Sequence, residues 1–208
     1  MSTLPIRRGD LMPAPFVGRA QAECYLDTAI ARMVQSREKA PDCGTFAFTA
    51  PQAGAGVTHV VEEVAVELAR RTGEAVLITP SSALDGMSSR DLMRVCRTCV
   101  TAPNVWRAIP RRDQFPDYSD TDMVSIGALS RSFGYMLIDC PALDTAPHVL
   151  TLGPHIDGVF LVVAAGETSR TRIVHAKRLL DASSVQLLGV ILNKRTYPVP
   201  GFLYRFFS

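Results

Sequence analysis

The 208-residue chain has no run of 18 apolar residues, and its first 16 residues contain no apolar core segment. The first absence argues against a membrane-spanning helix, and the second against a secretory signal. The chain also has no strong excess of one charge, because its formal net charge is +2, and we therefore expect no nucleic-acid partner. Its cysteines number five, an odd count that, in a chain without a signal, indicates a reducing, cytoplasmic location.

The composition that is present, 47% apolar and 20% charged, is typical of a globular protein. The length favours a flexible leader at residues 1–18, one domain at 19–195 and an apolar tail at 196–208. Within the domain, apolar runs typical of buried strands alternate with helical patterns. Strands are predicted at 46–48, 74–79, 104–109, 135–139, 158–164 and 186–192, and helices at 20–36, 58–72, 89–100, 123–133 and 167–182, with a helix or turn at 140–152. Strands that are apolar on both faces predict an α/β parallel sheet covered by helices on both sides, with ligands at the carboxyl ends of the strands.

The segment that follows the first predicted strand has the plan of a phosphate-binding loop. A loop at 51–56 with two glycines, Gly54 and Gly56, leads into a helix for which Thr58 is a plausible start, and Glu62 and Glu63 are expected in its first turn or so. Glycines allow backbone N–H groups to close around an anion at which the helix N-terminus points. The residues expected to bind a phosphate-bearing cofactor here are Gln52, Gly54, Ala55, Gly56, Val57 and Thr58.

The loop departs from the usual motif, G-x-x-x-x-G-K-[ST], at its charged position. Thr58 keeps the hydroxyl that would hold a magnesium ion, but Val57 replaces the lysine and the first glycine is absent. The sequence therefore predicts a P-loop NTPase-like fold whose loop keeps its shape and loses its charge. The alternative is that Gly54 and Gly56 only make a tight strand-to-helix turn.

A second candidate for the same site is Asp139, which ends the apolar strand 135–139. In phosphate-binding proteins a carboxylate at this position holds or positions the metal. Thr58 and Asp139 are therefore the predicted magnesium ligands, and Asp139 is the one candidate catalytic residue.

The order of segments TAPQAGAGVT, VLIT, FGYMLIDCPA, GVFLVVAAGETSR and LLGVILNKR resembles the ATPase domain of bacterial tyrosine autokinases of capsule and exopolysaccharide assembly. These belong to a deviant P-loop class that includes septum-site and plasmid-partition ATPases. The resemblance implies ATP or ADP with magnesium as cofactor and an adenine contact from Asn193. It also implies homo-oligomers and an inner-membrane polysaccharide chain-length or export partner, which would place the protein at the inner membrane.

Several positions depart from that family. Its second strand normally ends in Asp-x-Asp-x-Arg, whereas this chain has Thr79-Pro80-Ser81 followed by Ser82 and Ala83. Other departures are His148 near a family aspartate, Glu23 without the family's following arginines, and a tail with only Tyr197 and Tyr204 in place of a tyrosine cluster. We therefore expect a non-hydrolysing regulatory or scaffold pseudoenzyme. The alternatives are an active ATP-dependent tyrosine kinase or ATPase, and a partition-type positioning ATPase.

The remaining candidates have ordinary structural explanations. Cys96 and Cys99 form a lone C-x-x-C that we expect on a half-buried helix, since a metal site needs further ligands. The basic residues of the helix 167–182 are expected to form a solvated face. The apolar tail is expected to pack on its own sheet, on a partner or at a membrane surface.

Overall fold

The computed structural model describes residues 19–38, 43–84, 96–99, 102–109, 132–183 and 185–194. The predicted leader and tail lie outside these residues, as does nearly all of the predicted helix at 123–133. The helices are α1 (Arg19–Glu38), α2 (Val57–Thr72), α5 (His148–Leu152) and α6 (Arg170–Ala182), with short 3-10 turns at Ser81–Ala83 and Gly153–His155. The strands are β1 (Gly44–Thr49), β2 (Val76–Pro80), β3 (Cys96–Cys99), β4 (Ala102–Ala108), β5 (Tyr135–Asp139), β6 (Gly158–Ala164) and β7 (Leu187–Asn193).

The seven described strands form one sheet in the order β3-β4-β2-β5-β1-β6-β7. Every neighbouring pair is parallel except β3 and β4, which are antiparallel. The predicted α/β sheet is thus confirmed, with one correction at its edge. Residues 96–99 were expected in a helix but form β3, because backbone pairing with β4 overrides a weak local helical pattern.

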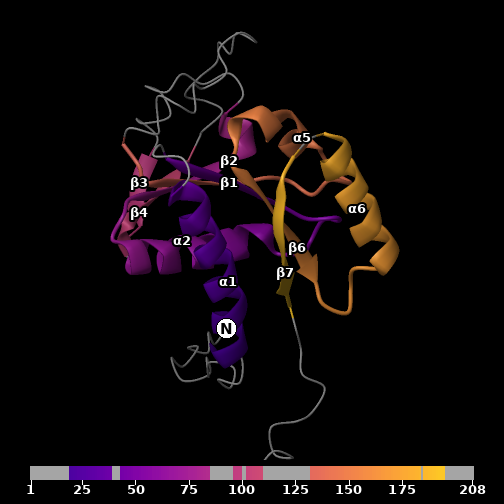
Figure 1. Ribbon diagram of the computed structural model, residues 1–208, viewed down its shortest axis with the longest axis horizontal. Helices are drawn as coiled ribbons and strands as arrows, with labels where there is room; N and C mark the ends of the chain where they lie inside the picture. The colour runs from indigo at the N-terminus through magenta and orange to yellow at the C-terminus, as the bar shows by residue number, and fades with distance from the viewer. Residues whose placement is uncertain are drawn as a thin grey trace, which may run out of the picture.

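Helices cover the sheet on both sides, which gives the predicted three layers (Figure 1). On one side α1 and α2 pack on the sheet, and on the other side α5 and α6 do. The central strands β1 and β6 are buried along their whole length, as their continuous apolar character predicts. On α2 the buried residues follow the three-and-four spacing of an amphipathic helix and are Val60, Val61, Val64, Ala65, Leu68 and Ala69.

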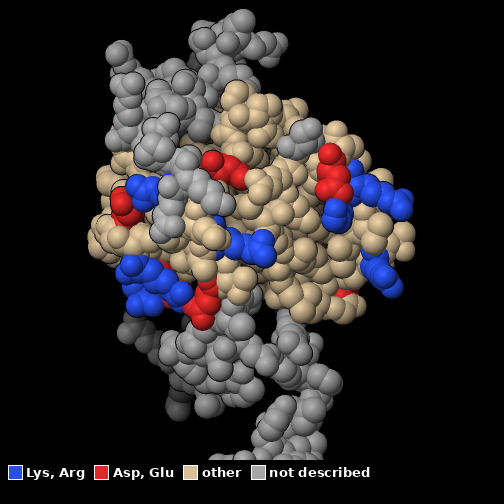
Figure 2. All heavy atoms as spheres, viewed as in Figure 1, with Lys and Arg blue, Asp and Glu red and all other residues tan. Residues whose placement is uncertain are grey.

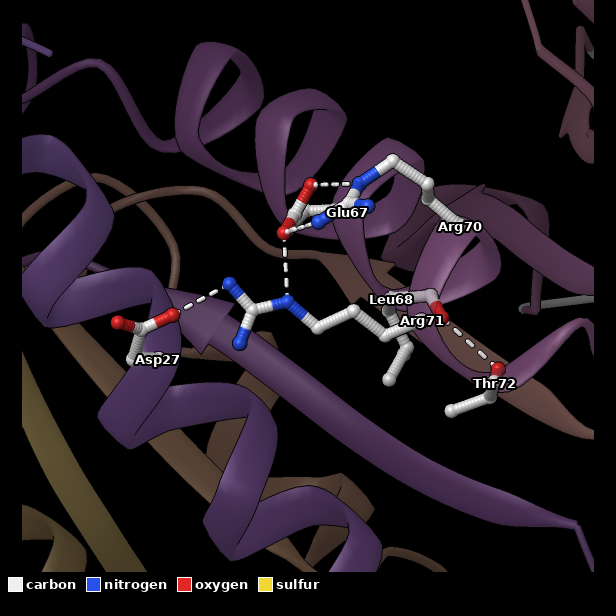
Figure 3. Close-up of polar contacts among 6 residues, drawn as sticks. All are labelled: Asp27, Glu67, Leu68, Arg70, Arg71 and Thr72. Atoms are coloured by element: carbon white, nitrogen blue, oxygen red, sulfur yellow. Dashed lines mark hydrogen bonds and ion pairs between the residues drawn. The ribbon is translucent and has the colours of Figure 1, made fainter.

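An ionic cluster joins α1 to the end of α2 (Figure 3). Arg71 lies between Asp27 of α1 and Glu67 of α2, and Arg70 also binds Glu67 with Nη2 to Oε1 at 2.6 Å. Hydrogen bonds from Arg70, followed by those from Arg71, lower the pKa of Glu67 to about 2. Within the residues that the structure describes, no helix is long and apolar enough to cross a membrane.

Candidate functional site

The loop between β1 and α2 owes its shape to two glycines with left-handed backbone conformation. Gly54 has φ 82° and Gly56 has φ 84°, values that side-chain-bearing residues rarely adopt. A Cβ atom at Gly54 would meet nothing within 4 Å, so the outer side of the loop is open to a ligand. A Cβ atom at Gly56 would collide with Asn193 Nδ2, so a side chain at this position would force Asn193 to move.

Helix α2 begins at Val57, immediately after the loop, and no side chain caps it. The first helical hydrogen bond runs from Val60 N to Gly56 O at 3.1 Å, and the N–H groups that precede it have no partner within the helix. The structure corrects two expectations here: Thr58 is the second residue of α2 rather than its start, and Glu62 and Glu63 follow its first turn. An uncapped N-terminus beside an open glycine loop fits a phosphate group.

The Thr58 hydroxyl and the Asp139 carboxylate lie side by side at the carboxyl end of the sheet. Thr58 Oγ1 donates to Asp139 Oδ2 at 2.7 Å, which joins the second residue of α2 to the last residue of β5. Burial raises the pKa of Asp139, while the Thr58 hydrogen bond and then the charge of Arg107 act in the opposite direction. A hydroxyl and a carboxylate are oxygen ligands that suit Mg²⁺. Among the described residues no group of three or more His, Cys, Asp and Glu is placed to hold a metal, so further ligands would come from phosphate or water.

Val57 occupies the place of the loop lysine, and its side chain is part of the protein's packing. It is half-buried against the core cluster that α1 and α2 form with the sheet. The loop therefore presents backbone N–H groups and a hydroxyl to a bound phosphate, but it has no cation of its own.

The end of β2 carries neutral groups where the family resemblance implies carboxylates. Thr79 is fully buried, and Ser81 is buried with its Oγ 3.3 Å from Nδ1 of His148 at the start of α5. Pro80 pairs with Asp139, so this Ser81–His148 contact lies next to the Thr58–Asp139 pair. No sequence motif predicts the contact between Ser81 and His148.

Asn193, at the end of β7, holds the loop from the opposite side. Its Nδ2 donates to Ala55 O at 2.9 Å, and Gln52 lies half-buried in the same loop. Of the predicted binding residues, the structure thus brings Asn193 to the loop glycines and Asp139 to Thr58. The adenine contact of Asn193 stays a prediction.

A basic side chain without a signal in the sequence lies one helical turn from the Thr58–Asp139 pair. Arg107 of β4 forms an ion pair with Glu62, one helical turn after Thr58 on α2. The charge of Arg107 lowers the pKa of Asp139, while the charge of Glu62 raises it.

The predicted solvated basic face of α6 is confirmed. Arg170, Arg172, Lys177 and Arg178 are exposed, and ion pairs join Arg172 to Asp144 and Lys177 to Asp181. Figure 2 shows basic and acidic side chains close together at the right of the view, over α6, rather than a surface of one charge.

Fold and site together define a protein of the P-loop ATPase fold, of the type found in septum-site and partition ATPases. The septum-site protein MinD from Pyrococcus horikoshii, solved with Mg-ADP, superposes with a TM-score of 0.52 at 17% identity over 79% of this chain and 76% of its own. No protein-family model matches the chain.

The more specific resemblance is to bacterial tyrosine kinases. The chain is 33% identical over 69 residues to the tyrosine-protein kinase CpsD of Streptococcus agalactiae, a match that covers 33% of this chain and 30% of that protein. Among solved structures, the BceF tyrosine kinase domain gives a TM-score of 0.62 at 17% identity over 83% of this chain and 76% of its own. The chimerical protein CapA2B2 gives a TM-score of 0.60 at 18% identity over 79% of this chain and 82% of its own. The predicted resemblance to the tyrosine autokinases is thus confirmed, as a local sequence match and a shared fold.

Proposed function

We propose that this chain is a tyrosine-autokinase-like protein of exopolysaccharide or capsule assembly that binds nucleotide weakly and does not hydrolyse it. One observation carries the proposal: the open loop with its Thr58–Asp139 pair is intact, while the three positions that should add charge hold Val57, Thr79 and Ser81. Such a site can still recognise a phosphate group, but it has little with which to stabilise phosphoryl transfer.

Nucleotide binding and catalysis depend on the missing charges to different degrees. A charge-assisted hydrogen bond from lysine to phosphate contributes about 1.5–3 kcal/mol, so its loss weakens binding roughly 10- to 150-fold. The uncapped start of α2 still contributes about 0.3–2 kcal/mol toward an anion. Catalysis of phosphoryl transfer depends almost entirely on positioning and charge stabilisation. With no carboxylate at Thr79 or Ser81, we expect binding without turnover.

If nucleotide is bound, the residues have separate roles. The backbone of Gly54 and Gly56 and the N-terminus of α2 would hold the phosphates, and Thr58 and Asp139 would hold Mg²⁺, whose chemistry is to neutralise phosphate charge. Asn193 would keep the loop closed through Ala55 O.

The proposed biological role is regulatory or structural. A domain that senses nucleotide without consuming it suits a scaffold for an inner-membrane chain-length or export protein, and we propose such a protein as the partner. The support is the resemblance to CpsD and to the kinase domains, and the chain would then act at the cytoplasmic side of that membrane.

The test is an assay of both chemical outcomes on purified protein. We expect no magnesium-dependent phosphate release above a blank, and no phosphotyrosine by mass spectrometry after incubation with ATP, since the tail offers only Tyr197 and Tyr204. Phosphate release that disappears in Asp139→Ala would show an active ATPase. Phosphotyrosine that is absent from Gly56→Asp would show an autokinase.

The second candidate is an active kinase or ATPase that obtains its missing cation from elsewhere. The observation in its favour is the intact Thr58–Asp139 pair together with a nearby arginine, Arg107. A partition-type ATPase has support from the shared fold alone.

A further inference from the structure

One described cation, Arg107, comes from β4, a strand in which the sequence predicted no functional residue, and it forms an ion pair with Glu62 one helical turn from Thr58. β4 pairs with β2 with Arg107 opposite Ile78, and β2 pairs with β5 with Pro80 opposite Asp139. Arg107 therefore originates two strands from Asp139 and two residues further from the carboxyl edge of the sheet.

The position of Arg107 is set by α2, which packs on β4 and β2 (Figure 1). Thr58 and Glu62 are four residues apart on α2 and so lie on the same face of the helix, one turn apart. Thr58 contacts Asp139 and Glu62 contacts Arg107, so the two pairs lie one helical turn apart along α2. The order from the loop outward is glycine loop, Thr58–Asp139 pair and Glu62–Arg107 pair.

We propose that Arg107 is the cation of this nucleotide site and contacts the outermost phosphate in place of the missing loop lysine. The inference rests on the proposed function, because it assumes that the loop holds nucleotide. Phosphates bound at the start of α2 and at the metal pair would present their last phosphate toward the side from which Arg107 comes. In the free protein Glu62 holds Arg107 one helical turn from the Thr58–Asp139 pair.

The ion pair with Glu62 leaves Arg107 available. Its side chain is 39% exposed and that of Glu62 is 43% exposed, so a ligand can reach both. Exposed ion pairs contribute little to stability, so Arg107 can leave Glu62 for a phosphate at small cost. A planar guanidinium also suits bidentate contact with phosphate oxygens. Glu62 then acts as a competing anion that holds the arginine until nucleotide arrives.

The experiment is a calorimetric titration of the full chain with a non-hydrolysable ATP analogue and with ADP, both in magnesium. Arg107→Ala should weaken binding of the ATP analogue about tenfold or more and that of ADP less, and Arg107→Lys should recover part of the loss. Glu62→Gln should tighten binding of the analogue, and the double variant Glu62→Gln/Arg107→Ala should lose that gain. The matched control is Arg70→Ala, which removes an arginine that is also ion-paired on α2 but lies in the last turn of the helix, far from the glycine loop.

The outcomes separate the two proposals. If the wild type binds and Arg107→Ala binds the analogue equally well, Arg107 only ties β4 to α2 and the inference is wrong. An equal loss in Arg70→Ala would also overturn it, because the effect would be one of general charge. If the wild type binds neither ligand, the proposed function fails, and the inference fails with it. Thermal unfolding of each variant identifies any loss of binding that comes from misfolding.

Discussion

Restoring the lysine by Val57→Lys tests whether the loop is a nucleotide site that lacks one charge. The new lysine side chain would extend from the first residue of α2, which follows the loop whose Gly54 side is open. One charge-assisted contact to phosphate contributes about 1.5–3 kcal/mol, so affinity for ADP with magnesium should rise roughly 10- to 150-fold. Hydrolysis should stay at background, because Thr79 and Ser81 still supply no carboxylate.

The free protein should become less stable in the same variant, for two structural reasons. Val57 packs against the core cluster of α1, α2 and the sheet, and lysine replaces only part of that apolar contact with its stem. A positive charge at a helix N-terminus also opposes the helix dipole, at a cost of about 0.3–1 kcal/mol. Bound phosphate would relieve the second cost, so ligand should stabilise Val57→Lys more than the wild type in thermal unfolding.

The assay is calorimetric titration of wild type, Val57→Lys and Val57→Met with ADP and magnesium, alongside phosphate release from ATP. Val57→Met is the matched control, since it adds length without charge. If Val57→Lys binds no better than Val57→Met, the loop is an ordinary strand-to-helix turn and the assignment of the site is wrong.

Three further predictions concern stability. Burial raises the pKa of Asp139, so the charge of this carboxylate lowers the stability of the folded protein at neutral pH. Asp139→Asn should therefore unfold at a higher temperature than wild type at pH 7. A difference in unfolding temperature that does not shrink as the pH falls through the carboxyl range would contradict this. The pKa of Glu67 is lowered from 4.5 to about 2, so Glu67→Gln should reduce the free energy of unfolding at pH 7 by up to about 1 kcal/mol. This difference should shrink as the pH falls from 4.5 through about 2, and a difference that stays constant over that range would be the contrary result. Gly56→Ala should lower the free energy of unfolding by about 1–2 kcal/mol, because alanine is strained at the left-handed φ of 84°, and moving Asn193 should add to this loss. Denaturant unfolding that matches wild type would count against the described loop geometry.

Much of the fold could be predicted because its signals are local. Val60 to Ala69 repeat at helical spacing, and 158–164 is an uninterrupted apolar run, so α2 and β6 lie close to where the sequence placed them. β3 could not be found this way, because a four-residue edge strand is defined by its partner β4 rather than by its own pattern.

The site was partly predictable for the same reason. Gly54 and Gly56 lie in one short segment, and the pairing of Thr58 with Asp139 follows from the topology of parallel sheets, in which the carboxyl ends meet. The contact between Ser81 and His148 joins positions 67 residues apart and matches no motif. Arg107 was missed because one arginine within a strand has no sequence signature, and only the packing of α2 on β4 brings it near Asp139.

The most direct test of a site that binds nucleotide without hydrolysis is titration of the wild-type chain with ADP, with and without magnesium, beside Asp139→Asn. We predict weak, saturable binding that magnesium strengthens in the wild type and not in Asp139→Asn, because Thr58 and Asp139 together form the metal pair. Absence of saturable binding, or binding that magnesium affects equally in both proteins, would contradict the account.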